Sequence, residues 1–264
     1  IKKFGADVLR LWCSAQDYRD DNRISEEILN RVAEAYRRIR NTCRFMLGNL
    51  YDFDPATDSV TFAEMMPIDR LALHHLEQLK ERVLASYADF EFHSIYQAVN
   101  GFCTVELSAQ YLDILKDRLY TSRKDAGERR SSQTAMYLIT DTLTRLLAPL
   151  ISFTADEIWQ YLPGGREASV HLATFPQLVP GNKDEKLAEQ WGRLFDVRAD
   201  VLKALELKRV EKTIGHPLDA AVKLSAPPET IDFMNDYLDK LRAICIVTSL
   251  DLVEELSSEA FGGT

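Results

Sequence analysis

Long hydrophobic runs and clustered cysteines are absent from this sequence of 264 residues. No stretch approaches the roughly 18 consecutive apolar residues that a membrane-spanning helix needs, and no charged-then-apolar leader opens the chain. The four cysteines stand far apart, at Cys13, Cys43, Cys103 and Cys245. Zinc and redox motifs usually need close Cys-x-x-Cys pairs, so we interpret these cysteines as small buried apolar residues. We expect a cytoplasmic protein with no membrane partner.

Histidine is also scarce. The five are His74, His75, His93, His171 and His216. The adjacent pair would point to different sides of a helix, and the other three have no partner at the spacing of metal ligands. A glycine-rich loop of the kind that cradles phosphate is missing too. We therefore expect neither a catalytic residue nor a metal site in this chain.

An excess of positive charge is missing as well. The formal net charge is −9, whereas RNA is bound mainly through Lys and Arg. The distribution of charge matters more than its sum, because residues 31–44 contain only one acid, Glu34, against five arginines. These are Arg31, Arg37, Arg38, Arg40 and Arg44. The last third, from Gly181, is rich in Asp and Glu. A basic stripe on an acidic body is compatible with RNA binding.

The basic stripe lies on a predicted long helix. Ser25 is a good helix start, because its hydroxyl can cap free amides and the two glutamates after it lie near the positive end of the helix dipole. Apolar residues then recur at steps of three and four and form one buried arc: Ile28, Val32, Ala35, Tyr36, Ile39, Cys43, Met46, Leu47 and Leu50. The arginines divide between two polar edges, with Arg37, Arg40 and Arg44 on one and Arg31 and Arg38 on the other.

Helical periodicity continues through most of the chain. A surface connection over about 49–67, rich in Asp and Pro, is followed by apolar stripes that predict helices over about 68–87, 92–120 and 128–147. Pro149 ends or kinks the last of these. Thr154 fits a capping box that opens a short helix. The segment 169–180 is then expected to form an extended arm over the bundle.

The pattern changes in the last third. After a helix over about 184–213, two short β-rich runs, 220–224 and 244–248, flank a helix over about 228–242. The predicted fold class is therefore mainly α, an antiparallel helical bundle followed by a small α/β appendage. We divide the chain into a junction segment (1–24), the bundle with its arm (25–180), and the long helix with the appendage (181–264).

A second basic cluster gathers at one end of the predicted bundle. Its members come from the end of one helix, the following loop and the start of the next helix: Lys116, Arg118, Arg123, Lys124, Arg129 and Arg130. Tyr120 and Tyr51 could stack on splayed RNA bases or pack against the core. Exposed arginines are often only a solvated surface with weak ion pairs. A bundle tip of this composition nevertheless suits an RNA loop.

Four stretches resemble one protein family. They are I-K-K-F-G-A-D-V-L-R-L-W and its continuation to residue 50, F-H-S-I-Y-Q-A-V-N-G-F-C-T-V-E-L-S-A-Q-Y-L-D-I-L-K-D-R-L-Y from Phe92, L-T-R-L-L-A-P-L-I-S-F-T-A-D-E-I-W from Leu143, and S-V-H-L-A-T-F-P from Ser169. The chain resembles bacterial isoleucyl-tRNA synthetases of class I, in the region that follows the K-M-S-K-S loop. The third stretch is shared with the valine and leucine enzymes, whereas 17–25 and 111–120 look like the isoleucine member.

The resemblance implies an excised anticodon-binding region that binds isoleucine tRNA. The catalytic domain, on the same polypeptide, would use ATP and Mg²⁺. Many members of the family also carry a C-terminal zinc-binding cysteine cluster, which this chain either lacks or ends before, so that it would lie beyond residue 264. H-I-G-H and K-M-S-K-S are both absent here, so the chain alone is expected to be an inactive monomer without a cofactor. The expected tRNA contacts are Arg37, Arg38, Arg40, Arg44, Lys116, Arg118, Tyr120, Arg123, Lys124, Arg129 and Arg130. Two alternatives are the same region of a valine or leucine homologue and a helical scaffold that meets a basic partner.

Overall fold

The computed structural model describes residues 2–255 and 261–263. The chain divides into two compact units, Ile1–Glu185 and Lys186–Thr264. The first is helical and the second combines helices with two short strands, so the predicted fold class, mainly α with a small α/β appendage, is confirmed. No helix in the described ranges combines the length and the apolar character needed to cross a bilayer.

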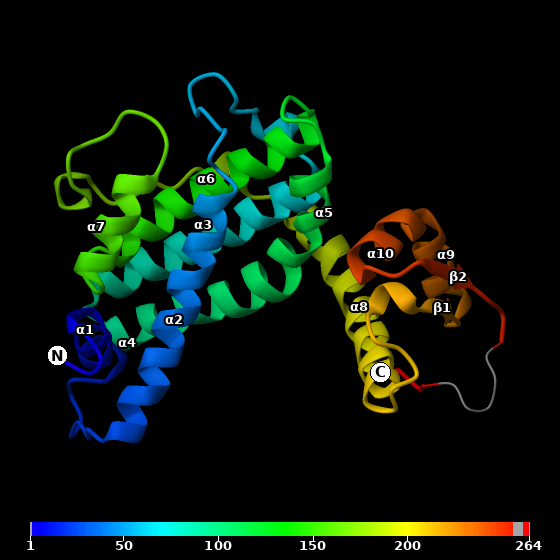
Figure 1. Ribbon diagram of the computed structural model, residues 1–264, viewed down its shortest axis with the longest axis horizontal. Helices are drawn as coiled ribbons and strands as arrows, with labels where there is room; N and C mark the ends of the chain where they lie inside the picture. The colour runs from blue at the N-terminus through cyan, green and yellow to red at the C-terminus, as the bar shows by residue number, and fades with distance from the viewer. Residues whose placement is uncertain (1, 256–260, 264) are drawn as a thin grey trace. The chain divides into compact units, whose positions relative to one another are not determined.

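The described residues of the first unit, from residue 2 on, form seven α-helices. They are α1 (Ala6–Ala15), α2 (Glu26–Gly48), α3 (Pro67–Ala88), α4 (Phe92–Phe102), α5 (Asp113–Thr121), α6 (Gly127–Leu147) and α7 (Ser152–Tyr161). Helix α1, from the predicted junction segment, packs on α2, α4 and α7. In Figure 1 the 49–66 connection and the loop between α5 and α6 lie at the top of this unit, away from α1 at its lower left.

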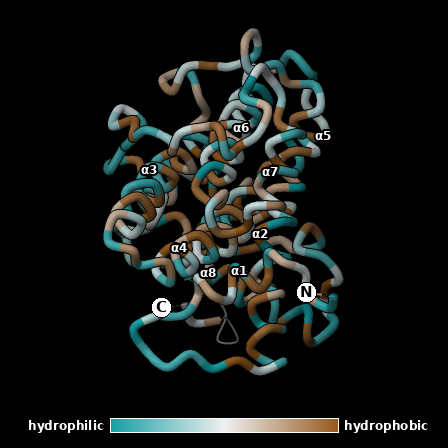
Figure 2. The backbone as a smooth tube through the Cα atoms, turned by 90° about the vertical axis from the view of Figure 1, so that its left-hand side faces the viewer, coloured by the Kyte–Doolittle hydropathy of each residue, from teal (hydrophilic) through white to brown (hydrophobic). Residues whose placement is uncertain are grey.

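Helix α2 forms as the sequence predicts. The Ser25 hydroxyl accepts a hydrogen bond from the backbone N–H of Ile28 at 3.2 Å and so caps the first turn. The predicted apolar arc faces the core, with six of its members buried: Val32, Ala35, Ile39, Cys43, Met46 and Leu50. In Figure 2 the helices alternate between brown and teal along their length, as amphipathic helices do, while many of the connecting loops are teal.

Two local predictions for the bundle differ from the structure. The 92–120 helix is continuous in path, but Cys103–Leu112 is wound as a π-helix between α4 and α5, and Ser108 Oγ donates to the carbonyl of Cys103 at 2.6 Å. The capping box at Thr154 is wrong, because α7 already begins at Ser152. The Thr154 hydroxyl lies inside the helix and donates to Asp7 of α1 instead.

The segment after α7 lies on the surface of α3. It includes residues 169–180, which the sequence predicts as an extended arm over the bundle. It contains two short 3-10 helices, Val170–Leu172 and Pro180–Asn182. A buried ion pair between Glu77 and Lys80 fastens it, because the Lys80 ammonium donates to the Gln177 carbonyl at 2.9 Å and Glu77 accepts from the Val179 N–H at 2.9 Å. The backbone of the arm thus satisfies two buried charges of α3.

The second unit consists of the long helix α8 (Glu185–Val210) and a small β-α-β arrangement after it. Strand β1 (Ala221–Leu224) pairs in parallel with β2 (Ser249–Leu252), with Ala221 opposite Ser249. Helices α9 (Pro228–Asp236) and α10 (Leu238–Cys245) connect the strands, since parallel neighbours need a long crossover. The single predicted helix over 228–242 is therefore interrupted at Tyr237.

The strand predicted over 244–248 is wrong. Ile244 and Cys245 form the buried end of α10, and Ile246 adopts a left-handed conformation with φ of 56° that ends the helix. The strand starts later, at Ser249. The apolar β-branched run is explained by burial, because Ile244, Cys245 and Val247 are all core residues.

Candidate nucleic-acid interface

The arginines of α2 lie along two edges that face different helices, as the helical wheel predicts. Arg40 contacts Glu157 of α7 at 3.4 Å. On the other edge, Arg38 lies near Tyr96 of α4, where burial raises the pKa of the phenol and the guanidinium opposes that rise. Arg31 pairs with Glu27, one turn before it on the exposed surface.

The first edge continues onto α7. Tyr36 and Thr154 share a hydrogen bond of 2.7 Å, and Arg40 contacts Glu157, so the two helices advance together by one turn between these contacts. Tyr161, at the last residue of α7, is 73% exposed. In the described part of the chain the Arg44 guanidinium has neither a hydrogen bond nor an ion pair.

Arg37 is the other strongly exposed cation of this edge. It pairs with Glu34 on the same helix, and both side chains are mostly in water. Exposed pairs of this kind contribute about 0 to 1 kcal/mol, so exchanging Glu34 for a phosphate oxygen costs little. Arg37 and Arg44 are therefore the α2 arginines best placed for an anionic ligand.

The basic tip divides into exposed and buried cations. The exposed ones are Lys116, Arg123 and Lys124. Lys116 and Arg123 each pair with an exposed acid of their own segment, at 2.7 and 2.8 Å. The Lys124 ammonium lies 5.8 Å from the ring centroid of Tyr51. Tyr120 is 65% exposed beside this loop.

Arg129 is buried, with only 4% of its surface exposed. It donates two hydrogen bonds to Asp52, at 2.7 and 3.0 Å, and a third to the Leu119 carbonyl at 3.3 Å. Burial alone would raise the pKa of Asp52, but hydrogen bonds from Arg129 and Gln133 outweigh it and lower that pKa. Three N–H donors of Arg129 are engaged by protein groups and the side chain is buried, so its prediction as a tRNA contact gains no support from this geometry.

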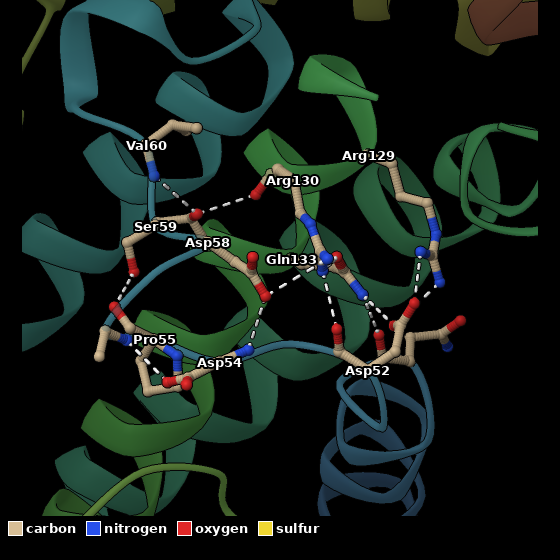
Figure 3. Close-up of polar contacts among 12 residues, drawn as sticks. Asp52, Asp54, Pro55, Asp58, Ser59, Val60, Arg129, Arg130 and Gln133 are labelled. Carbon is tan, nitrogen blue, oxygen red and sulfur yellow. Dashed lines mark hydrogen bonds and ion pairs between the residues drawn. The ribbon is translucent and has the colours of Figure 1, made fainter. Parts of the chain in front are cut away.

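Arg130 holds the same connection from the next position of α6. It donates to the Asp52 carbonyl at 2.9 Å and pairs with Asp58 at 3.3 Å. Figure 3 shows Arg129 directed at Asp52 and Arg130 between Asp52 and Asp58. The first turns of α6 thus fix the 49–66 connection to the bundle.

Arg118 belongs to an internal cluster around Asp69. Its guanidinium lies 3.3 Å from the Asp69 carboxylate, which also accepts from Tyr111 at 2.7 Å and Ser131 at 2.5 Å. Complete burial raises the pKa of Asp69, although Arg118 and these hydroxyls oppose the rise. Arg118 is therefore the counter-charge of a buried carboxylate, and little of it reaches the surface.

The sequence prediction missed the acids that organise the tip. Asp52 is only one of several turn-forming residues in its segment, and Asp69 follows Pro67 and Ile68 at a helix start, where an acid is common. Neither position signals a distant arginine. No group of three or more His, Cys, Asp or Glu side chains able to hold a metal occurs among residues 2–255 and 261–263.

Exposed cations lie along α2 and at the tip of one helical unit, and comparison with known proteins gives the class of this unit. Residues 69–224 match the family model described as the anticodon-binding domain of tRNA ligase. The chain belongs to this family.

The relatives specify the class further. An isoleucine–tRNA ligase of Geobacter sulfurreducens is 62% identical over 255 residues, which cover 97% of this chain. Those of Syntrophotalea carbinolica and Carboxydothermus hydrogenoformans are 54% and 48% identical over 99% and 97% of it. The chain spans 28% of the length of each of these relatives. The predicted resemblance to isoleucyl-tRNA synthetases is thereby confirmed.

Proposed function

We propose that this chain binds the anticodon arm of an isoleucine tRNA and holds it for a ligase domain on the same polypeptide. The observation that supports this most is the exposed edge of Arg37 and Arg44 on a member of the anticodon-binding family. The ligase domain would join isoleucine to the tRNA with ATP and Mg²⁺. The full protein would act as a cytoplasmic monomer, and any zinc site would lie beyond residue 264.

The two basic surfaces have different tasks in this proposal. The α2 edge contacts phosphates, because the planar arginine fork offers two parallel donors to their oxygens. The tip meets the anticodon loop, where unstacked bases are available to aromatic side chains. The net charge of −9 repels a polyanion elsewhere on the chain and so confines binding to these surfaces.

The predicted tRNA-contacting residues differ in how exposed they are to solvent. Six members of the set are exposed on the two proposed surfaces and are retained for direct contact with tRNA: Arg37, Arg44, Lys116, Tyr120, Arg123 and Lys124. Arg38 is also exposed, but it lies with Arg31 on the opposite edge of α2 and is not retained. Arg40 is half-buried beside Glu157 and contributes positive charge at the edge of the surface. Arg118, Arg129 and Arg130 act from inside the bundle, since their guanidinium groups pair with buried or half-buried acids.

The test is a titration of labelled isoleucine tRNA with the chain at several salt concentrations. Arg44→Ala should weaken binding by about 1 kcal/mol, or about fivefold, and should reduce the salt slope by about one. Arg31→Ala is the matched control, because Arg31 is equally exposed but lies on the opposite edge of α2.

Three outcomes would contradict the proposal. Equal losses from Arg44→Ala and Arg31→Ala would show that the α2 edge is not the contact surface. Absence of saturable binding by the unsubstituted chain would favour a helical scaffold for a protein partner. Tighter binding of a valine or leucine tRNA than of the isoleucine tRNA would assign the chain to a different tRNA.

A further inference from the structure

Two tyrosines at the tip leave most of their rings in water. Tyr51 is 72% exposed at the start of the 49–66 connection, and Tyr120 is 65% exposed near the end of α5. Neither ring fills the core, so packing does not explain their size. Each lies next to a residue that Arg129 binds: Asp52 follows Tyr51, and Leu119 precedes Tyr120.

Arg129 therefore acts on Tyr120 through its neighbour Leu119, and on Tyr51 both through its neighbour Asp52 and directly. The pKa of Arg129 is raised chiefly by its hydrogen bonds to Asp52 and also by Tyr51. The two terminal nitrogens of Arg129 hold the Asp52 carboxylate, and its Nε donates to the Leu119 carbonyl. Gln133, one turn further along α6, donates to the Asn49 carbonyl at 2.9 Å and to Asp52 at 2.8 Å. The residues that flank Tyr51 and the residue that precedes Tyr120 are thus hydrogen-bonded to a single helix, α6.

This anchoring prepares the tip for a ligand. An aromatic ring on a free loop must be ordered when it binds, and that ordering reduces affinity. A bidentate pair with a buried arginine orders it beforehand. The entropy lost in ordering the two rings is therefore part of the folding free energy of the bundle and does not reduce the affinity for the ligand.

The charge around the rings suits a nucleotide. Lys124 lies 5.8 Å from the Tyr51 ring centroid, where it can meet the phosphate of a base stacked on that ring. The nearest acid of the loop, Asp125, is paired with Arg123 at 2.8 Å, which keeps the pKa of that carboxyl low and matches its charge. Stacking and positive charge therefore occur together at this place.

We propose that Tyr51 and Tyr120 are stacking surfaces for unpaired bases of the tRNA loop, and that Arg129 is the positioning residue that sets both. This inference rests on the proposed function and assigns the base-contacting groups within it. It also changes the role predicted for Arg129, from a phosphate contact to an internal support. Stacking tolerates any base, so these tyrosines supply affinity, and base identity is read by other contacts.

The experiment uses an anticodon stem-loop of isoleucine tRNA with 2-aminopurine at each loop position in turn. The fluorescence of this base is quenched when it stacks. Binding of the unsubstituted chain should quench the fluorescence at one loop position or more. Tyr51→Phe keeps an aromatic ring and should preserve this quenching. Tyr51→Leu and Tyr120→Leu should each weaken binding about fivefold or more and reduce the quenching.

Tyr18→Leu is the matched control. Tyr18 is 58% exposed and has a guanidinium, that of Arg19, at 5.9 Å from its ring centroid, but it belongs to the segment between α1 and α2. Its loss should leave both affinity and quenching unchanged. If Tyr51→Leu and Tyr120→Leu behave like Tyr18→Leu while the stem-loop still binds, the stacking inference is wrong and the proposed function stands.

The variant Arg129→Lys distinguishes a positioning role of Arg129 from a direct contact with phosphate. Lysine keeps the positive charge, so a phosphate contact would survive with its salt slope, whereas the fork that holds Asp52 and Leu119 would be lost. We expect reduced quenching with an unchanged salt slope. Asp52→Asn gives a second measurement with Arg129 in place and should reduce quenching in the same way. Full quenching by both folded variants would overturn the positioning role, and failure of the unsubstituted chain to bind would overturn the proposed function itself.

Discussion

Asp7 of α1 accepts hydrogen bonds from both the backbone N–H and the hydroxyl of Thr154 in α7, at 2.7 and 2.6 Å. Helix α7 has no side-chain cap of its own, so a carboxylate from another helix satisfies its first turn. Tyr36 of α2 joins the same hydroxyl at 2.7 Å. One buried acid thus connects three helices.

Removing this acid should destabilise the bundle. Asp7→Ala leaves the N–H groups of α7 unpaired in the interior, and we expect the free energy of unfolding to fall by about 2 to 3 kcal/mol. Urea unfolding followed by circular dichroism measures it. Asp21→Ala, at an exposed position, is the control and should change stability by less than about 0.5 kcal/mol. Similar values for the two variants would show that α7 does not depend on Asp7.

The Asp52–Arg129 pair should make the bundle sensitive to acid. Folding lowers the pKa of Asp52, because hydrogen bonds from Arg129 and Gln133 outweigh the opposing effect of burial. Its stabilising contribution is therefore present above the unfolded-state pKa of about 3.9 and is lost as the pH falls through the lower folded-state value. Asp52→Asn should lower stability at pH 7 and flatten the decline between about pH 5 and pH 3. An equally steep decline in the variant, measured by urea unfolding at each pH, would contradict this.

The thiols should divide into one accessible group and three protected ones. Cys13 is exposed, whereas burial raises the pKa of Cys43 to about 12, that of Cys245 to about 11, and that of Cys103 above its ordinary value. Ellman's reagent at pH 8 should modify one thiol rapidly in the folded chain and all of them in urea. Cys13→Ser should abolish the rapid phase. A second rapid thiol would mean that one of the buried positions opens to solvent.

The chain alone should not catalyse isoleucine-dependent exchange of pyrophosphate into ATP. No glycine-rich phosphate loop, H-I-G-H or K-M-S-K-S occurs in its sequence. A full-length isoleucine–tRNA ligase in the same assay shows that the reagents are active. Exchange above the blank that persists through successive purification steps and follows the chain would place catalytic groups on it.

The helices of the bundle could be predicted because each is long and amphipathic. The apolar arc of α2 and its Ser25 cap are local features, and both occur in the structure. Features that depend on distant contacts were mispredicted. Thr154 lies inside α7 because Asp7 takes over the capping, and the 244–248 run ends a helix because its side chains are buried against the second unit's core.

The candidate site divides in the same way. The wheel gave the two edges of α2 correctly, since the direction of an arginine on a helix follows from its position. It gave no sign that Arg118 and Arg129 point inward, because Asp69 and Asp52 meet them only after α3 and the 49–66 connection fold against α5 and α6. A cluster of basic residues in a sequence thus gives the number of positive charges, but it does not show which of them are exposed to solvent.

The π-helical stretch Cys103–Leu112 sets the angular phase between α4 and α5. Deleting one residue there would turn everything after it by about 100°, the rotation of one α-helical residue. Leu115 and Leu119 would leave the core, and Tyr120 would turn with them. The position of the basic tip is therefore constrained by chain length in a half-buried stretch that carries no cation, so insertions and deletions in Cys103–Leu112 should be tolerated less than those in the 122–126 loop.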